Sequence, residues 1–378
     1  MPEARSQQNK YMKRALELAR KGWGDTHPNP MVGAVIVIGG KIVAEGWHRA
    51  AGEPHAEIEA LRNFDHRLHQ EATLYITLEP CSTVGRTGAC TSAIIASGIP
   101  RVMIGTLDPN PAHRGRGIDY LRQAGIEVSV GIMEETCADL NLIFNHSISR
   151  KTPLLAAKIA TTLDGKFSAA NGHSKWITGE SARKDVMHWR RYFPAIAGSA
   201  STVLTDNPKL TSRLPDSTCC PRRFIFDRTL DTLPYLDSLH IFKGDNAAET
   251  TLICDEKADP EAARRAGLDI WQLPVCKGHL DLDAFRTRCI DGGINGVYIE
   301  PGPRWASALL KEGQIDYLFH YLAPKYLVDS EASGMGQPRA TTSIKEATHL
   351  QQVQHHHFEQ DLLIRGWLGN AHETIIKD

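Results

Sequence analysis

Apolar and polar positions alternate in a regular order along the first half of the chain. Apolar residues recur at helical spacing from Met12 to Ala19 and predict a helix over residues 6–21. An apolar run over 32–38, the pair Gly39-Gly40 and the segment 41–47 predict a β-hairpin. Further segments predict, in order, a helix over 55–63, a strand over 73–78, a helix over 91–97, a strand over 101–106, a helix over 118–124, a strand over 126–130 and a helix over 133–145. This order favours a mostly parallel sheet covered by helices.

The second half of the chain continues the alternation of strands and helices. The pattern predicts strands over 154–160, 195–198, 223–226, 251–254, 297–300 and 315–323, and helices over 180–192 and 305–311. Between the two halves, residues 147–153 are polar and end in Pro153, which is typical of a linker. We therefore predict two α/β domains, over residues 1–147 and 153–378.

Length, charge and cysteine content narrow the functional classes. A chain of 378 residues is long enough for two domains. Its 43 Lys and Arg balance 44 Asp and Glu, so no general positive field favours nucleic acid as a partner. No apolar run approaches the ~18 residues that cross a membrane, and the start lacks a secretory signal. We expect a cytoplasmic protein whose eight cysteines stay reduced and are free to bind metal.

Two short motifs indicate a catalytic zinc site. The first is His55-Ala56-Glu57, and the second is Pro80-Cys81 followed by Cys90. A hydrolytic zinc ion takes three protein ligands and keeps one position open for water, and one imidazole with two thiolates meets that count. The order of these residues is the signature of zinc deaminases, which act on nitrogen heterocycles. We predict His55, Cys81 and Cys90 as the metal ligands.

Glu57 is the predicted proton carrier of this site, and Glu59 is its alternative. In a regular helix, residues two apart do not face each other, so His55 would share a face with Glu59. Pro54 favours a helix that begins only at His55, where Glu57 can still turn toward the metal. The triplet His355-His356-His357 is interpreted as solvated surface.

Several longer motifs resemble those of one family, the bacterial bifunctional deaminase-reductases of riboflavin biosynthesis. The resemblance rests on the eight residues between Cys81 and Cys90 and on the segments 27–33, 46–57, 108–111 and 115–117. It implies a cytidine-deaminase-like three-layer α/β domain followed by a dihydrofolate-reductase-like domain. The implied activities are zinc-dependent deamination of a phosphoribosylamino-diaminopyrimidinone and NADPH-dependent reduction of its ribose. It also implies a homo-oligomer, a dimer or a tetramer.

The resemblance assigns deaminase residues one by one. Residues that match substrate positions of the family's first domain are Asn29, His48, Arg86, Asp108 and Asn110. The loop between the cysteines departs from the family pattern, because Thr83 replaces a histidine and Gly88-Ala89 replace two prolines.

The second domain lacks the Gly-x-Gly-x-x-Gly motif of a Rossmann nucleotide site. Instead, a predicted strand leads into Pro301-Gly302-Pro303 and a helix, a turn whose free N–H groups suit a phosphate. Pro301 stands where the family has a small residue, and it removes one donor. The resemblance implies cofactor contacts at Thr161, Trp176, Thr202, Asp206, Gly302, Pro303, Arg304, Trp305, Ala306, Ser307 and Ala308, and substrate contacts at Lys158, Ser174, Arg190, Leu210, Arg213 and Glu300.

Three other functions are compatible with these observations. One is a deaminase whose reductase half no longer works, and another is a zinc-stabilised regulatory or binding protein without turnover. A nucleic-acid deaminase is the third, which the balanced charge disfavours.

Overall fold

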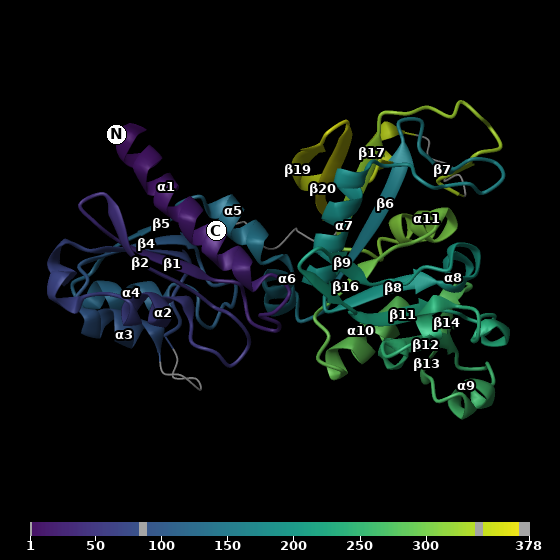
Figure 1. Cartoon of the computed structure of the whole chain (residues 1–378), viewed down its shortest axis with the longest axis horizontal. Helices are drawn as coiled ribbons and strands as arrows, with labels where there is room; N and C mark the ends of the chain where they lie inside the picture. Colours follow the sequence, from purple (N-terminus) through teal and green to yellow (C-terminus); the bar gives the residue numbers. More distant parts are fainter. Residues whose placement is uncertain (1, 83–88, 337–342, 370–378) are drawn as a thin grey trace. The chain divides into compact units, whose positions relative to one another are not determined.

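The computed structural model describes residues 2–82, 89–336 and 343–369. The chain divides into two compact units, Met1–Lys151 and Thr152–Asp378, which we call unit 1 and unit 2 (Figure 1). Three residues named in the sequence analysis lie outside the described residues, namely the predicted substrate residue Arg86 and the departures from the family pattern at Thr83 and Gly88.

Unit 1 is a five-stranded sheet between two helical layers. Its strand order is β2-β1-β3-β4-β5, with bounds β1 Gly33–Ile38, β2 Lys41–Trp47, β3 Thr73–Leu78, β4 Arg101–Thr106 and β5 Glu127–Val130. The helices are α1 Pro2–Ala19, α2 Ala56–Arg62, α3 Cys90–Ser97, α4 Arg116–Gln123, α5 Glu134–Leu140 and α6 Leu142–Arg150. Figure 1 shows α1 and α5 on one side of this sheet and α2, α3 and α4 on the other.

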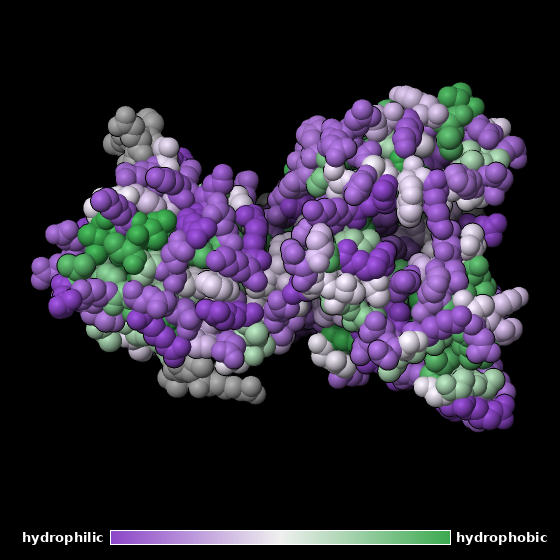
Figure 2. Space-filling model, viewed as in Figure 1, coloured by the Kyte–Doolittle hydropathy of each residue, from purple (hydrophilic) through white to green (hydrophobic). Residues whose placement is uncertain are grey.

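Most of the surface in the view of Figure 2 is hydrophilic, and its hydrophobic residues form separate patches. In the described parts of the chain, no helix combines the length and the apolar character that a membrane span requires.

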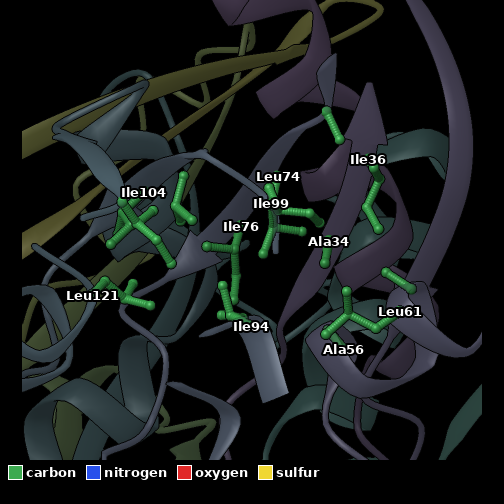
Figure 3. Close-up of a cluster of buried hydrophobic side chains, with 14 of the residues drawn as sticks. Ala34, Ile36, Ala56, Leu61, Leu74, Ile76, Ile94, Ile99, Ile104 and Leu121 are labelled. Atoms are coloured by element: carbon green, nitrogen blue, oxygen red, sulfur yellow. The ribbon is translucent and has the colours of Figure 1, made fainter. Parts of the chain in front are cut away.

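The core of unit 1 lies between the sheet and the layer of α2, α3 and α4. Alternate strand residues such as Ile36, Ile76 and Ile104 face this layer and meet Ile94 and Leu121 from its helices (Figure 3). On the opposite face, α1 approaches β1 so closely that a Cβ on residue 33 would lie 1.9 Å from the Ala15 carbonyl oxygen. Only glycine allows this packing distance.

Unit 2 contains a nine-stranded sheet in the order β13-β12-β11-β8-β16-β6-β17-β20-β19. The seven strands from β13 to β17 pair in parallel, and β20 and β19 add an antiparallel edge. The bounds are β6 Leu154–Thr162, β8 Ala195–Ser199, β11 Arg222–Phe226, β12 Thr250–Asp255, β13 Asp269–Leu273, β16 Gly296–Ile299, β17 Tyr317–Ala323, β19 Leu350–Phe358 and β20 Asp361–Leu368.

Helices cover both faces of the nine-stranded sheet. They are α7 Glu180–Tyr192, α8 Ala200–Asp206, α9 Glu261–Arg265, α10 Leu282–Asp291 and α11 Pro303–Lys311. Phe285 of α10 and Leu309 of α11 pack on one face, and Trp189 of α7 packs on the other against Phe319. Short strand pairs complete the unit, namely β7 Lys166–Ser168 with β18 Ser333–Gly334, β9 Ser212–Leu214 with β10 Ser217–Cys219, and β14 Val275–Cys276 with β15 His279–Leu280.

Several predicted elements have the observed bounds, and others are wrong. The strands 73–78 and 101–106 and the helix 180–192 are confirmed residue by residue. The helix predicted over 133–145 is two helices that break at Asn141, whose side chain bonds the backbone of Met31 through Met31 N–H to Oδ1 at 2.8 Å and Nδ2 to the carbonyl at 2.9 Å. The linker predicted over 147–153 contains the boundary between the two units, which falls between Lys151 and Thr152, but its first part is helical because α6 continues to Arg150.

Two further expectations about the sheets need correction. The first sheet is evenly mixed rather than mostly parallel, since β1 pairs antiparallel with both β2 and β3. The histidine triplet lies in β19, which the pattern did not predict. His355 and His357 are exposed there, whereas His356 points to the other side and meets Arg365 Nε at 3.1 Å.

Adjacent isoleucines of α3 provide a test of this packing. Ile94 is fully buried and Ile95 is 39 % exposed. Because both changes are Ile→Ala in one helix, their effects on helix propensity cancel in the comparison. We expect Ile94→Ala to lower the free energy of unfolding of unit 1 by about 2–5 kcal/mol and Ile95→Ala by about 1 kcal/mol or less. Calorimetry of the full chain measures both, and equal effects would contradict the assigned core.

Candidate functional site

The three predicted metal ligands converge in unit 1 from separate elements. His55 directly precedes α2, Cys81 follows β3, and Cys90 is the first residue of α3. Their ligand atoms all lie within 4.8 Å of one another. His55 Nδ1 is 3.2 Å from Cys90 Sγ and 3.7 Å from Cys81 Sγ. One imidazole nitrogen and two sulfurs at this spacing form a donor set that fits a zinc ion with an open fourth position.

The surroundings of Cys81 favour its thiolate, which is the form that binds metal. A hydrogen bond with the Cys90 side chain lowers the pKa of the Cys81 thiol. The backbone N–H of Cys90, at the start of α3, also donates to Cys81 Sγ at 3.4 Å.

The structure favours Glu57 over Glu59 beside these ligands. The His55 backbone is extended, with φ −71° and ψ 160°, so α2 begins after it and the regular helical spacing does not apply. Glu57 is 3 % exposed, and its carboxyl group interacts with the Cys90 side chain. Burial raises the pKa of Glu57 to about 7. Glu59 instead forms an ion pair with Arg62 at 2.8 Å.

Asn29 and His48 form a hydrogen-bonded pair next to His55. His48 Nδ1 is 3.1 Å from the Pro54 carbonyl oxygen, to which it donates, and Nε2 then accepts from Asn29 Nδ2 at 3.2 Å. The rings of His48 and His55 meet edge to face at 5.4 Å. Burial lowers the pKa of His48, which keeps this ring neutral.

The predicted substrate residues Asp108 and Asn110 lie in one turn after β4. Burial raises the pKa of the Asp108 carboxyl, and the nearby charges of Glu79 and of the proposed ligand Cys81 raise it further. Asp108 Oδ1 accepts the Asn110 N–H at 2.8 Å. Arg86 lies outside the described residues, so its predicted contact with the substrate phosphate stays a prediction.

Unit 2 contains a cavity of about 1010 Å³ near the carboxyl ends of β6 and β16. Ten of the predicted site residues line it, five assigned to the cofactor and five to the substrate. These are Trp176, Thr202, Asp206, Gly302 and Pro303, and Lys158, Ser174, Arg190, Arg213 and Glu300. The end of a parallel sheet is the usual place for a ligand in such folds.

A buried ion pair forms the charged wall of the cavity. Arg190 of α7 donates through Nε and Nη2 to the two oxygens of Glu300, at 2.7 and 2.8 Å. Burial opposes ionisation of Glu300, but Arg190 and Lys158 lower its pKa. Burial also lowers the pKa of Lys158. The wall carries more positive than negative charge, because the Glu300 carboxylate is surrounded by Lys158, Arg190 and Arg213. Such a wall suits an anionic ligand.

Some predicted contacts lie away from the cavity lining. Thr161 Oγ1 pairs with His320 at 2.8 Å, and Leu210 is buried. Only Gly302 and Pro303, at the start of α11, line the cavity, and Arg304, Trp305, Ala306, Ser307 and Ala308 do not. Trp305 packs against Phe226, Ala306 is buried, and Ser307 Oγ accepts the Gly336 N–H at 2.7 Å. For these residues the contact stays a prediction.

Among the cavity residues that sequence reasoning missed are five basic ones. They are Lys175, Arg183, Lys184, Lys209 and His240. Arg183 donates to the Thr178 carbonyl at 2.6 Å and lies over the Trp176 ring at 4.6 Å. One signal was available, since Arg183, Met187 and Arg190 recur at helical spacing on one face of α7.

Comparison with known proteins identifies both halves. The family described as the RibD C-terminal domain matches residues 153–364, and the cytidine and deoxycytidylate deaminase zinc-binding region matches residues 5–106. The riboflavin biosynthesis protein RibD of Aquifex aeolicus is 40 % identical over 354 residues, which covers 94 % of this chain and 96 % of that protein. The chain belongs to the RibD family.

Two more RibD proteins support the assignment. The Escherichia coli RibD protein is 41 % identical over 86 % of this chain and 89 % of its own length. A solved structure from Thermotoga maritima, a diaminohydroxyphosphoribosylaminopyrimidine deaminase and 5-amino-6-(5-phosphoribosylamino)uracil reductase, has a TM-score of 0.80 at 33 % identity and covers 97 % of this chain and 99 % of that one.

As a member of the RibD family, the protein is a bifunctional enzyme of riboflavin biosynthesis, a hydrolytic deaminase and a reductase. Its cofactors are zinc and NADPH. The expected order, a cytidine-deaminase-like domain followed by a dihydrofolate-reductase-like domain, is confirmed.

Zinc binding tests the ligand set directly. Unit 1 has three cysteines, of which Cys137 is buried away from the proposed ligands. We expect the wild type and Cys137→Ala to hold about one zinc per chain and Cys81→Ser to lose it, because the serine hydroxyl is a poor zinc donor. Metal analysis after dialysis measures the content. Retention of zinc by Cys81→Ser would contradict the assignment.

Proposed function

We propose that unit 1 deaminates 2,5-diamino-6-(5-phosphoribosylamino)pyrimidin-4(3H)-one and that unit 2 then reduces the ribose of the product to a ribityl chain with NADPH. The observation that carries the first step is a buried Glu57 carboxyl beside the ligand atoms of His55, Cys81 and Cys90. The Thermotoga maritima relative is a deaminase and a reductase of the same phosphoribosylaminopyrimidine chemistry.

Glu57 is the proton carrier of the proposed deamination. When bound by the three ligands, zinc supplies an activated water whose pKa falls to about 7. Glu57 would accept one proton of the attacking water and pass it to the exocyclic nitrogen, which leaves as ammonia. The second water proton would pass to the adjacent ring nitrogen as the carbonyl forms at the ring carbon. A carboxyl group whose pKa lies near neutrality can both accept and release this proton.

The polar residues around the metal site hold the substrate in this proposal. Asn29 and His48 present a neutral, fixed hydrogen-bonding pair to the pyrimidine ring. Asp108 and Asn110 contact it from the turn after β4, and Arg86 binds the sugar phosphate. A preorganised set of this kind costs little reorganisation when the substrate binds.

In unit 2, the chain binds and orients two anionic molecules. NADPH supplies the hydride, and the protein contributes position and charge. We assign Trp176, Thr202, Asp206 and Gly302 to the cofactor, because all four line the cavity and match cofactor positions of the family. Thr202 and Gly302 are neighbours there, since a Cβ on residue 302 would lie 3.4 Å from Thr202 Oγ1. Arg213 suits a sugar phosphate, which a guanidinium group binds with two parallel hydrogen bonds. Arg190 is already paired with Glu300 through Nε and Nη2, so in this proposal it adds positive charge beside the substrate.

The intact charged wall favours a working reductase over a reductase half without activity. Arg190 is buried and Lys158 is half-buried, and each would be costly to retain without the carboxylate of Glu300. The cavity is also large enough for a dinucleotide next to a sugar phosphate.

The family resemblance further predicts a homo-oligomer in the cytoplasm. All eight cysteines are free thiols, which suits a reducing compartment. Both statements stay predictions, and light scattering of the purified enzyme measures the first.

Two glutamates of α2, Glu57 and Glu59, allow a catalytic effect to be distinguished from the general effect of removing one negative charge. We expect Glu57→Gln to slow ammonia release by about 10²–10⁴-fold with its zinc retained, because the amide cannot carry the proton. Glu59→Gln removes a similar charge from the ion pair with Arg62 and is expected to leave the rate within about twofold. Ammonia release from the diaminopyrimidinone is the measurement. Near-normal release by Glu57→Gln would refute the assigned role.

A cavity arginine tests the phosphate assignment of unit 2. Arg213 donates to Thr211 Oγ1 at 2.7 Å from the cavity wall. We expect Arg213→Met to raise the KM for 5-amino-6-(5-phosphoribosylamino)uracil about ten- to hundredfold, the loss of a charged hydrogen bond. Arg265 of α9 is exposed and does not line the cavity, so Arg265→Met is the control. NADPH oxidation measures both variants, and an unchanged KM in Arg213→Met would count against the assignment.

A further inference from the structure

Glu79 lies two residues before the ligand Cys81, at the end of β3, and it is 5 % exposed. Its carboxylate accepts three backbone N–H groups from one segment. The N–H of Asp108 donates to Oε2 at 3.2 Å, that of Gly115 donates to Oε2 at 3.0 Å, and that of Gly117 donates to Oε1 at 2.9 Å. The buried Glu79 carboxylate therefore supplies the acceptors for three backbone N–H groups that have no backbone partner in these bonds.

These three donors are located at the two ends of the segment 108–117. Asp108 opens it, and Gly115 and Gly117 form the start of α4. The free N–H groups at the start of a helix attract negative charge, so the carboxylate also caps α4. The cap is closely packed, because a Cβ on residue 117 would lie 2.3 Å from the Pro80 carbonyl oxygen.

Internal hydrogen bonds make the segment a rigid frame between its fixed ends. The Asn110 carbonyl accepts the N–H groups of His113 and Arg114, both at 2.9 Å. The Asn110 side chain accepts the Ala112 N–H at 3.0 Å, and Asp108 accepts the Asn110 N–H. Because the ends are bonded to Glu79, the position of this frame relative to Cys81 depends on a single carboxylate.

We propose that Glu79 is a positioning residue for deamination, which holds the segment 108–117 against the metal site and so places Asp108 and Asn110 on the pyrimidine ring. The inference rests on the proposed function of unit 1 and adds a residue that touches neither metal nor substrate. A glutamine cannot replace this carboxylate, because its amide group would turn a donor toward at least one backbone N–H.

Glu79→Gln in the zinc-loaded full chain is the first test. We expect kcat/KM for ammonia release to fall about ten- to hundredfold, chiefly through KM, because the segment shifts while Glu57 stays in place. Zinc content and NADPH oxidation with 5-amino-6-(5-phosphoribosylamino)uracil remain normal. Glu127→Gln, at an exposed position of β5, is the matched control and keeps the wild-type KM. A wild-type KM in Glu79→Gln, or loss of zinc together with activity, would overturn the proposal.

A double-mutant cycle separates a positioning role from general weakening. Asn110→Ala raises KM in the wild-type background and adds little in the Glu79→Gln background, since the frame has already moved. Full additivity of the two effects contradicts the proposal.

Hydrogen exchange tests the geometry without the reaction. In Glu79→Gln, the backbone amides of 108–117 lose protection while those of β3 keep it, and unchanged protection of 108–117 overturns the inference. If the wild type releases no ammonia from this pyrimidine, the proposed function fails. The exchange result still decides whether Glu79 holds the segment 108–117 in place.

Discussion

The convergence of His55, Cys81 and Cys90 within 4.8 Å is the constraint on which unit 1 depends. Each ligand lies at the end or start of a regular element, so the metal site exists only if α2, α3 and β3 hold their relative positions. The buried side chains beneath them, such as Ile76 and Ile94, supply that support (Figure 3). Stability and metal binding therefore share one packed core.

The candidate site of unit 2 depends on charged side chains in the wall of its cavity. Lys158, Arg190 and Glu300 are largely removed from water in the cavity wall, where each charge would be unfavourable alone and the set is tolerable together. Their arrangement leaves an excess of positive charge toward the cavity, which matches a sugar phosphate and a dinucleotide. In both units the candidate site lies beyond the ends of parallel strands, since Cys81 follows β3 and the cavity lies near the ends of β6 and β16.

The convergence of His55, Cys81 and Cys90 and the buried strands could be predicted from the sequence, because each leaves a local signal. The ligands follow a fixed order of residue types, and strands such as β3 and β4 are short apolar runs. Long-range contacts leave no such signal. Asn141 ends a helix by bonding Met31, which is 110 residues away, and β19 is largely polar because one of its faces is exposed. Glu79 was missed for the same reason, since its partners are backbone groups of a distant turn.

In the proposed function, deamination in unit 1 precedes reduction in unit 2. The most direct measurement supplies the wild-type, zinc-loaded enzyme with 2,5-diamino-6-(5-phosphoribosylamino)pyrimidin-4(3H)-one and follows ammonia and NADPH together, with and without NADPH present. We expect ammonia at the same rate in both cases, and NADPH oxidation only after a lag in which ammonia has accumulated. Oxidation of NADPH before any ammonia appears, or ammonia release that requires NADPH, would contradict this order of reactions.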